Sequence, residues 1–458
     1  MSTLYVSAPL NRHSPWLTYA LGELGRLAGL ERPMKLVTPD EVPFGAPHLA
    51  YGSGTAAARI PCQPVHRSGA MDSVTLDCGP RGLRQVMVYA DSLDSEGRPD
   101  LLFNFFAYIS CLEEYEWERV HGPAHSYAAR LGGDRRRFDR PYANYLALAF
   151  RQLVSGTYPE CLAEQATIGS ICLTHDVDVV SKSMRTRLKE GGFRLFNVLR
   201  DLGAGRRPDL AGAARMLVGS ADYFTFDAIA RLEDSFGFRS SFNLFGGTPA
   251  DGLGARLRRS VFDPAYDLAS SSRLVSELKR LIARGWDVGV HFAFDSWRDP
   301  DPMRRERETV ERALGVDSVT ACRQHWFRFS LAETWKAQWA AGIRTDTTLG
   351  FTDRPGFRAG LAARYHPYDH RTGRALPIVV VPTVLMDTHL FYYDRMDPER
   401  RREVLDGTLD DIAGVGGEAC IIWHSHALST DHRWGGEYRR ILGAMREKGL
   451  RDGRVGGT

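Results

Sequence analysis

In this chain of 458 residues, four short apolar runs each end in histidine, aspartate or arginine. The runs begin at Ile171, Trp286, Ser318 and Ala419. Helix-like segments lie between them, and strands that alternate with helices predict a parallel sheet in which such runs are the buried strands. Where strands and helices alternate around a barrel, functional groups gather at the carboxyl ends of the strands. The four ends are therefore expected to lie together.

The first run ends in two carboxylates, Asp176 and Asp178. Side chains two residues apart on an extended backbone point the same way, so these acids are expected to share one pocket. Such closeness is electrostatically costly unless a cation or a proton resolves it, which favours a metal ligand beside a general base. Taken alone, the pair is also compatible with a solvated loop that turns on aspartate.

The other runs supply further histidine, aspartate and arginine. His291 ends the second run, and Asp295 follows four residues later. The third run ends in Arg323 and His325, and the fourth in His424. Imidazole and carboxylate are ligand types that zinc takes, and a catalytic site keeps one position open for water. A lone histidine at a strand end is more often a satisfied polar group, so the metal interpretation depends on the recurrence.

Residues 165–430 resemble the polysaccharide deacetylases of the NodB-homology type, carbohydrate esterase family 4. The first motif of that family holds a base aspartate and then a metal-binding aspartate, and Asp176 and Asp178 match its D-x-D variant. The second motif supplies two histidines four residues apart. Here His291 fills the first position and Asp295 the second, which departs from the pattern.

The later motifs of the family follow in order. Arg323 resembles the third-motif arginine that orients the base, although the usual Arg-x-Pro continuation is absent. Asp346 resembles the aspartate of the fourth motif. The fifth motif, an aliphatic residue, any residue and then histidine, is matched by Ile422, Trp423 and His424.

The resemblance implies a role for each of these residues. One divalent metal ion, expected to be zinc, is held by Asp178, His291 and Asp295. The base, the arginine that steers it and the acid that protonates the departing amine are Asp176, Arg323 and His424. The substrate-binding positions are Ile422, Trp423, Asp346 and His325.

The segments 353–360 and 386–388 resemble a bacterial subgroup of the family in which a distinct N-terminal domain precedes the catalytic one. The expected fold is therefore α/β, a distorted (β/α) barrel of the NodB-homology type preceded by a smaller α/β N-terminal domain. The expected divisions are an accessory domain at 1–120, a connector at 121–165, the catalytic barrel at 166–435, and a C-terminal helix with a flexible tail at 436–458.

The implied reaction is removal of an N-acetyl or O-acetyl group from a sugar or glycan precursor in cell-surface polysaccharide biosynthesis. Two alternatives stay open: a C–N hydrolase acting on a small non-sugar amide, and a catalytically weak descendant that binds a glycan. Asp295 keeps the last alternative open, because two carboxylates on one metal ion reduce its Lewis acidity. A pocket without extended aromatic subsites would favour the small amide.

Composition limits the partners and the compartment. The seven cysteines are widely spaced and contain no CxxC pair, which indicates reduced thiols rather than a disulfide framework. A formal charge of +3 is too small to indicate nucleic-acid binding. The start of the chain lacks the pattern of a secretory signal, and the longest apolar run is far too short to cross a bilayer. A cytoplasmic location is therefore expected.

Residues 182–207 hold eight lysines or arginines and two acidic residues, with apolar residues interleaved. This pattern predicts either a basic amphipathic helix that makes a peripheral membrane contact or a solvated insertion over the barrel. In the first case, the basic residues are also suited to hold the phosphates of a carrier-linked sugar.

Overall fold

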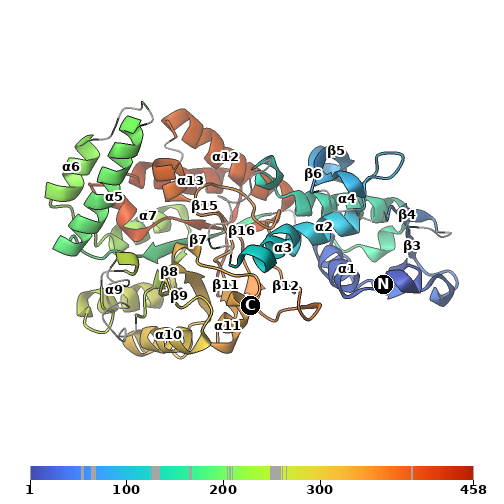
Figure 1. Cartoon of the computed structure of the whole chain (residues 1–458), viewed down its shortest axis with the longest axis horizontal. Coiled ribbons are helices and arrows are strands. Elements are labelled where there is room, and N and C mark those ends of the chain that lie inside the picture. Colours follow the sequence, from blue (N-terminus) through green and yellow to red (C-terminus); the bar gives the residue numbers. More distant parts are fainter. Residues whose placement is uncertain are drawn as a thin grey trace.

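The structure is a computed structural model of the whole chain. A large parallel sheet formed by the second part of the chain lies beside a smaller α/β region formed by the first part (Figure 1). The residues that the structure describes are 2–52, 56–62, 69–123, 125, 135–164, 168–203, 205, 208, 210–247, 259, 261–264, 266–393 and 396–456.

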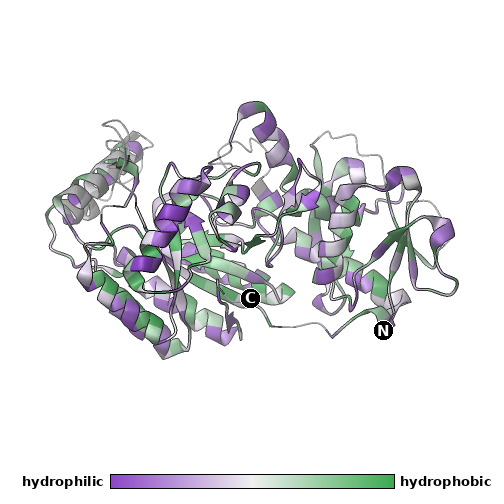
Figure 2. Cartoon of the chain, turned by 90° about the horizontal axis from the view of Figure 1, so that it is seen from below, coloured by the Kyte–Doolittle hydropathy of each residue, from purple (hydrophilic) through white to green (hydrophobic). Residues whose placement is uncertain are grey.

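The large sheet contains nine described strands, and the pairings between them are parallel. Eight follow the order β14-β11-β10-β9-β8-β7-β16-β15, and the ninth, β17, pairs with β7. Strands β7 and β8 are buried along almost their whole length, as parallel strands covered on both faces usually are. Hydrophobic residues show as green on strands inside the molecule (Figure 2). The bounds are β7 Ser170–Val177, β8 Ser240–Leu244, β9 Asp287–Phe292, β10 Ala321–Gln324, β11 Thr345–Asp346, β14 Val379–Val380, β15 Thr383–Met386, β16 Glu418–Ile422 and β17 Arg451–Asp452.

The two edge strands of this sheet, β14 and β15, are separated in sequence by residues 381 and 382 alone. So short a linker spans roughly 11 Å at most, so the sheet must curl until its edges approach each other. Within the described residues, no ladder joins these edges. The result is a curled, barrel-like α/β sheet, which agrees with the distorted barrel expected from the sequence.

Helices connect the strands of the large sheet. Two of these helices begin at the proline of an Asp-Pro pair, and their local sequence determines where they begin and end. Asp299 before α10 and Asp397 before α12 each accept a hydrogen bond from a backbone N–H of the first turn, and the left-handed Gly315 and Gly416 end the two helices. The bounds are α7 Phe226–Phe236, α9 Ser272–Ala283, α10 Pro300–Leu314, α11 Thr334–Ala340, α12 Pro398–Val415 and α13 Gly435–Glu447.

The first part of the chain holds a four-stranded parallel sheet in the order β2-β1-β3-β4 and an antiparallel hairpin of β5 and β6. The expected connector, 121–165, contains helix α4, which packs against α2 and β5 and so belongs with this part. The bounds are β1 Tyr5–Ser7, β2 Lys35–Val37, β3 His48–Tyr51, β4 Ala58–Ile60, β5 Met71–Asp77, β6 Leu83–Tyr89, α1 Pro15–Leu27, α2 Leu101–Ile109, α3 Leu112–His121 and α4 Tyr142–Thr157.

One hydrophobic core extends through both parts of the chain. An antiparallel pair from the second part, β12 Tyr368–Asp369 and β13 Arg374–Ala375, packs against the first part. The ring of Tyr368 lies 4.9 Å from that of Tyr19 on α1 and 5.1 Å from that of Phe106 on α2, measured between centroids. Because the interior is shared, the division into accessory domain and barrel stays a prediction.

Two further helices, α5 Met184–Gly203 and α6 Leu210–Val218, form a hairpin at the edge of the molecule (Figure 1). They contain most of the basic segment noted in the sequence. None of the described helices combines the length and the apolar character needed to cross a membrane.

The C-terminal segment differs from the flexible tail expected after the last helix. Residues 451 and 452 form β17, which extends the large sheet beside β7. The N–H of Arg451 donates to the carbonyl of Gly169 and that of Gly453 to the carbonyl of Ile171, both at 2.9 Å. The glycine content of the segment predicted flexibility, but the first residues of β7, which precede its pairing with β8, supply partners for the backbone of residues 451–453.

Candidate functional site

The carboxyl ends of β7, β9, β10 and β16 meet at one cavity of about 390 Å³. Neighbouring strands bring the polar residues together, because Arg323 on β10 is in register with His291 on β9. The expectation that the four strand ends lie together therefore agrees with the structure. Among the polar residues that line the cavity are Asp176, Asp178, His291, Gln324, His325 and His424.

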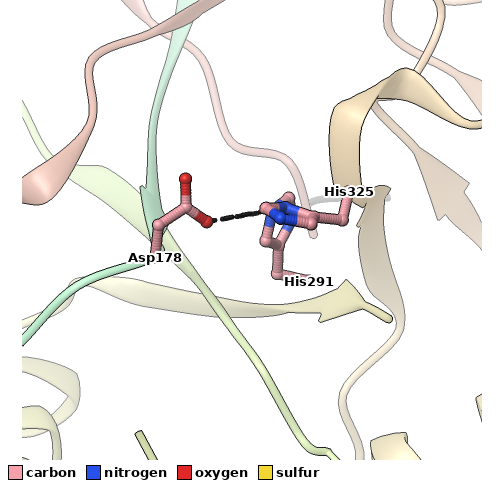
Figure 3. A group of neighbouring side chains, drawn as sticks. All are labelled: Asp178, His291 and His325. Atoms are coloured by element: carbon pink, nitrogen blue, oxygen red, sulfur yellow. Dashed lines mark hydrogen bonds and ion pairs between the residues drawn. The ribbon is translucent and has the colours of Figure 1, made fainter. Parts of the chain in front are cut away.

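Asp178, His291 and His325 form a compact group with the chemistry of a metal site (Figure 3). Asp178 Oδ1 lies 3.3 Å from His291 Nε2 and 3.6 Å from His325 Nδ1. The two ring nitrogens are 2.6 Å apart. Three such ligands with a fourth position left for water are typical of a catalytic zinc site.

The hydrogen bonds and contacts of this group direct its ligand atoms toward one another. His325 Nε2 donates to the carbonyl of Phe262 at 2.7 Å, so in the neutral ring the lone pair is on Nδ1, which faces Asp178. Asp178 Oδ1 is buried and accepts no hydrogen bond from any described residue. The imidazoles, first that of His325, hold the pKa of Asp178 well below its ordinary value in spite of burial. A cation among the three ligand atoms would satisfy this oxygen.

Asp295, the expected third ligand, lies outside this group. Strand β9 ends at Phe292, and a turn follows in which Glu306 accepts hydrogen bonds from the N–H of Ala293 at 2.8 Å and from Ser296 Oγ at 2.5 Å. This turn leaves the side chain of Asp295 exposed. His325, expected only as a substrate-binding residue, takes the place beside Asp178. Its position at the end of the neighbouring strand was the available signal.

Asp176 and Arg323 form a buried ion pair at the wall of the cavity. Arg323 Nη1 donates to Asp176 Oδ1 at 2.7 Å, and Asn243 Nδ2 donates to the same oxygen at 2.8 Å. Burial alone would raise the pKa of Asp176, but Arg323 outweighs it, with help from His291 and His424, and the pKa falls to about 2. The carboxylate is therefore ionised at neutral pH, and Oδ2 is the oxygen left to face the cavity.

His424 is held by Asp387, a residue for which the sequence predicted no role in the site. His424 Nδ1 lies 2.7 Å from Asp387 Oδ1, and the N–H of His424 donates to Asp387 Oδ2 at 2.8 Å. Burial would lower the pKa of His424, but Asp387 and then Asp178 and Asp176 raise it to about 10. The ring is thus an imidazolium at neutral pH, and its Nε2 lies 3.6 Å from Asp178 Oδ2.

Asp346, the residue expected to match the fourth motif, lies inside the protein and does not line the cavity. It accepts hydrogen bonds from Trp335 Nε1 at 3.1 Å and Gln338 Nε2 at 2.9 Å. The structure thus places Asp387, not Asp346, beside the fifth-motif histidine. The apolar run that ends at Met386 gives the same signal as the other four, so the rule applied to those runs would have found Asp387.

Two expected substrate-binding residues, Ile422 at the end of β16 and Trp423 directly after it, have different surroundings. Ile422 forms a small apolar cluster with Phe327 and Met386, which line the cavity. Trp423 is buried behind the cavity, where its ring stacks 5.3 Å from that of Tyr438. An apolar group in the cavity would therefore meet Phe327 and Met386 of this cluster rather than Trp423.

The segment after β10 adds two features that the sequence did not predict. Trp326 and Phe327 adopt left-handed φ angles of 56° and 48°, which is rare for bulky residues and typical of functional sites. Trp326 remains 43% exposed at the cavity wall. Gln324 is fully buried and lines the cavity, and neither its Oε1 nor its Nε2 has a hydrogen-bond partner among the described residues.

Comparison with known proteins gives few matches. No protein-family model matches the chain, and no curated protein does. Among solved structures, one described as a T48 deacetylase with substrate is 10% identical, with a TM-score of 0.30, over 64% of this chain and 92% of that one. Two structures of a mutant CE4 family pseudoenzyme, one with restored enzymatic activity, are 10% identical, with TM-scores of 0.29, over 64% of this chain and 67% of theirs.

The side chains at the cavity themselves define the chemistry of the site. The cavity holds a three-ligand group, an ionised carboxylate fixed by arginine and an imidazolium fixed by aspartate. A carboxylate and an imidazolium on one site are a base and an acid whose environments keep them in opposite protonation states. Such a pair, placed beside a Lewis acid, suits hydrolysis of an amide or ester.

Proposed function

We propose that this protein is a metal-dependent deacetylase that removes an acetyl group from a sugar or glycan precursor. The observation that carries the proposal is the group of Asp178, His291 and His325 at the wall of a cavity that also contains Asp176 and His424. A ligand group without an adjoining acid and base would support metal binding alone.

Asp176 and His424 each carry out one proton transfer in the hydrolysis of the acetyl group. Asp176 Oδ2 accepts a proton from the attacking water, whose oxygen bonds to the acetyl carbon. His424 Nε2 gives its proton to the departing amine, or to the alcohol of an ester, as the bond to the acetyl carbon breaks. The products are acetate and the free amino sugar or hydroxyl sugar. When bound, a divalent cation, proposed to be zinc, would supply Lewis acidity and lower the pKa of bound water.

The lining of the cavity favours a sugar over a small non-sugar amide. Trp326, Tyr392 and Tyr393 present aromatic surface to it, in addition to Phe262. Aromatic faces are suited to contact the apolar faces of sugar rings, and a small amide would leave them unused. Cell-surface glycan biosynthesis and a cytoplasmic location, both expected from the sequence, are the finer parts of this proposal.

Metal analysis of matched variants tests the ligand group. Purified protein is expected to hold about one equivalent of zinc or another transition metal, because three ligand atoms lie within 4.8 Å of one another. His325→Ala is expected to lose it, whereas Asp295→Ala is expected to keep it. Retention by His325→Ala together with loss by Asp295→Ala would restore the ligand set expected from the sequence.

Acetate release from N-acetylated chitooligosaccharides tests the reaction. Asp176→Asn, which keeps the size of the side chain, is expected to keep the metal and lose about 10²–10⁴-fold in kcat. Release of acetate at the unchanged rate in this variant would remove Asp176 as the base. Bound metal with no acetate released from any acetylated sugar would favour the glycan-binding alternative.

A further inference from the structure

Large apolar side chains are concentrated on the exposed surface of the α5–α6 hairpin. The described residues include thirteen exposed large apolar side chains, of which seven belong to these two helices. The seven are between 57% and 81% exposed. Single exposed apolar residues are ordinary on a protein surface, but a concentration marks an interaction site. The seven are Met184, Leu188, Leu195, Leu199, Leu202, Leu210 and Val218.

The exposed residues of α5 share one face of the helix, which we call the leucine stripe. From Met184 to Leu202 they follow at intervals of four, seven, four and three residues, the spacing of a single row on an α-helix. Val198, by contrast, is buried. Helix α6 packs against α5, so the hairpin presents the stripe at the edge of the molecule (Figure 1).

Basic residues accompany the leucine stripe. The segment 182–207 holds eight lysines or arginines and two acidic residues. Of the two arginines that precede a leucine of the stripe by one residue, Arg187 is half-buried and Arg194 is directed at Tyr392. The excess of cations therefore belongs to the segment as a whole rather than to a row beside the stripe. An apolar helix face on a segment with an excess of cations is complementary to an anionic lipid surface, where the apolar face enters the acyl boundary and the cations meet the headgroups.

The hairpin is also attached to the wall of the candidate active site. Arg194 Nη2 donates to Tyr392 Oη at 3.0 Å, and its guanidinium lies 4.7 Å from the centroid of that ring. Arg200 Nη2 donates to the carbonyl of Tyr392 at 3.3 Å. Tyr392 lines the cavity. A surface bound by the hairpin would therefore be connected to the site through one side chain.

We propose that the α5–α6 hairpin docks this protein peripherally on an anionic lipid surface through the leucine stripe. Charge disfavours a second copy of the chain as the occupant, because pairing two such hairpins brings like charges together. Docking also points to an acetylated sugar carried on a lipid as the substrate class. That last step rests on the proposed function, whereas the docking does not.

Vesicle co-sedimentation of the full chain tests the proposal. Vesicles of phosphatidylcholine mixed with phosphatidylglycerol are expected to pellet the protein at low salt, and vesicles of phosphatidylcholine alone are expected to pellet less. Higher salt is expected to weaken binding, because it screens the basic residues. The double variant Leu195→Gln/Leu199→Gln is expected to bind the anionic vesicles about tenfold more weakly, because it removes two apolar contacts.

A matched control carries the same change elsewhere. Leu83 on β6 and Val120 on α3 are 70% and 77% exposed, and Leu83→Gln/Val120→Gln is expected to bind as the unchanged protein does. Both double variants alter exposed side chains, so their circular dichroism and melting temperature should match those of the parent. Absence of pelleting with anionic vesicles at low salt would overturn the proposal, as would equal binding by the two double variants.

The oligomeric state separates the docking from self-association. If the parent elutes as a dimer that Leu195→Gln/Leu199→Gln converts to a monomer, and no vesicle binds it, the stripe belongs to a second copy and the proposal fails. Vesicle binding needs no catalysis, so it is unaffected by failure of the deacetylase proposal. Conversely, acetate release from soluble sugars needs no membrane, so a protein that deacetylates without binding vesicles would overturn the docking alone.

Discussion

Asp176 and Asp178 lie two residues apart at the end of β7, and their neighbouring side chains suit them to different roles. Arg323 and Asn243 both donate to Asp176 Oδ1, whereas Asp178 Oδ1 faces the rings of His291 and His325. A carboxylate bound by a cationic side chain is fixed in orientation but keeps a free oxygen for a proton. A carboxylate beside two imidazoles is suited to bind a metal instead. One local pattern therefore supplies two functions.

Asp387 is expected to act through His424. Asp387→Asn removes the charge that stabilises the imidazolium, so kcat for acetate release should fall about 10²-fold while KM and the metal content stay nearly constant. Steady-state kinetics and metal analysis check this. The control is Asp346→Asn, which alters a buried aspartate away from the cavity and should lower stability without this loss in kcat. Equal kcat in Asp387→Asn and the parent would remove the role.

Gln324 is expected to bind the substrate through hydrogen bonds of its side-chain amide. Its buried amide lacks partners among the described residues, so a substrate that supplies them gains binding energy. Gln324→Leu should raise KM about tenfold and leave the melting temperature equal or higher. Gln338→Leu is the comparison, because Gln338 donates to Asp346 and should lose stability with KM unchanged. A destabilised Gln324→Leu with normal KM would mean that the amide is bonded within the protein.

The strand ends were predictable, but the turns that follow them were not. An apolar run with a polar end defines where a parallel strand stops, and this located Asp176, Asp178, His291 and His424 at one site. The direction that the chain takes after a strand depends on tertiary contacts. Asp295 lies four residues after His291 in a turn held by Glu306, a residue of α10 that is distant enough in sequence to escape a motif. The family's spacing therefore predicts a ligand at a position whose side chain is exposed in the structure, outside the group of Asp178, His291 and His325.

Glu306 connects α10 to the turn after β9 through its hydrogen bonds with Ala293 and Ser296. Burial raises the pKa of Glu306 from 4.5 to about 7, although Ser296 and the N–H of Ala293 oppose this. The folded protein thus favours the protonated acid. The stability that it contributes is fully present below about pH 4.5 and is lost as the pH rises through about 7.

Glu306→Gln is expected to remove this pH dependence. The variant cannot ionise at this position, and its amide can still accept from Ala293 and bond Ser296. Its free energy of unfolding relative to that of the parent should therefore rise by about 3 kcal/mol between about pH 4 and pH 8. Urea unfolding at both pH values measures the difference. A constant difference would show that Glu306 has the same pKa in the folded and unfolded chain.

Buried polar contacts join the two parts of the chain, in addition to the shared core. Glu114 of α3 forms an ion pair with Arg358, and each is about 2% exposed. Arg358 also donates to the carbonyl of Gly350 at 2.8 Å. One turn later, Glu118 accepts hydrogen bonds from Ser330 Oγ and from the N–H of Leu331. Because α3 is bound to the loops of the large sheet in this way, the two parts are expected to unfold together.

Arg358→Met tests that expectation. It leaves the Glu114 carboxylate buried without its cation, so the free energy of unfolding should fall by about 3–5 kcal/mol. The control is Arg400→Met, which breaks an ion pair with Glu403 whose side chains are 63% and 57% exposed and should cost less than about 1 kcal/mol. Urea unfolding followed by circular dichroism and tryptophan fluorescence should give one coincident transition that Arg358→Met shifts as a whole. Two transitions, only one of them shifted, would instead support an accessory domain with a core of its own, as the sequence division at residue 120 implies.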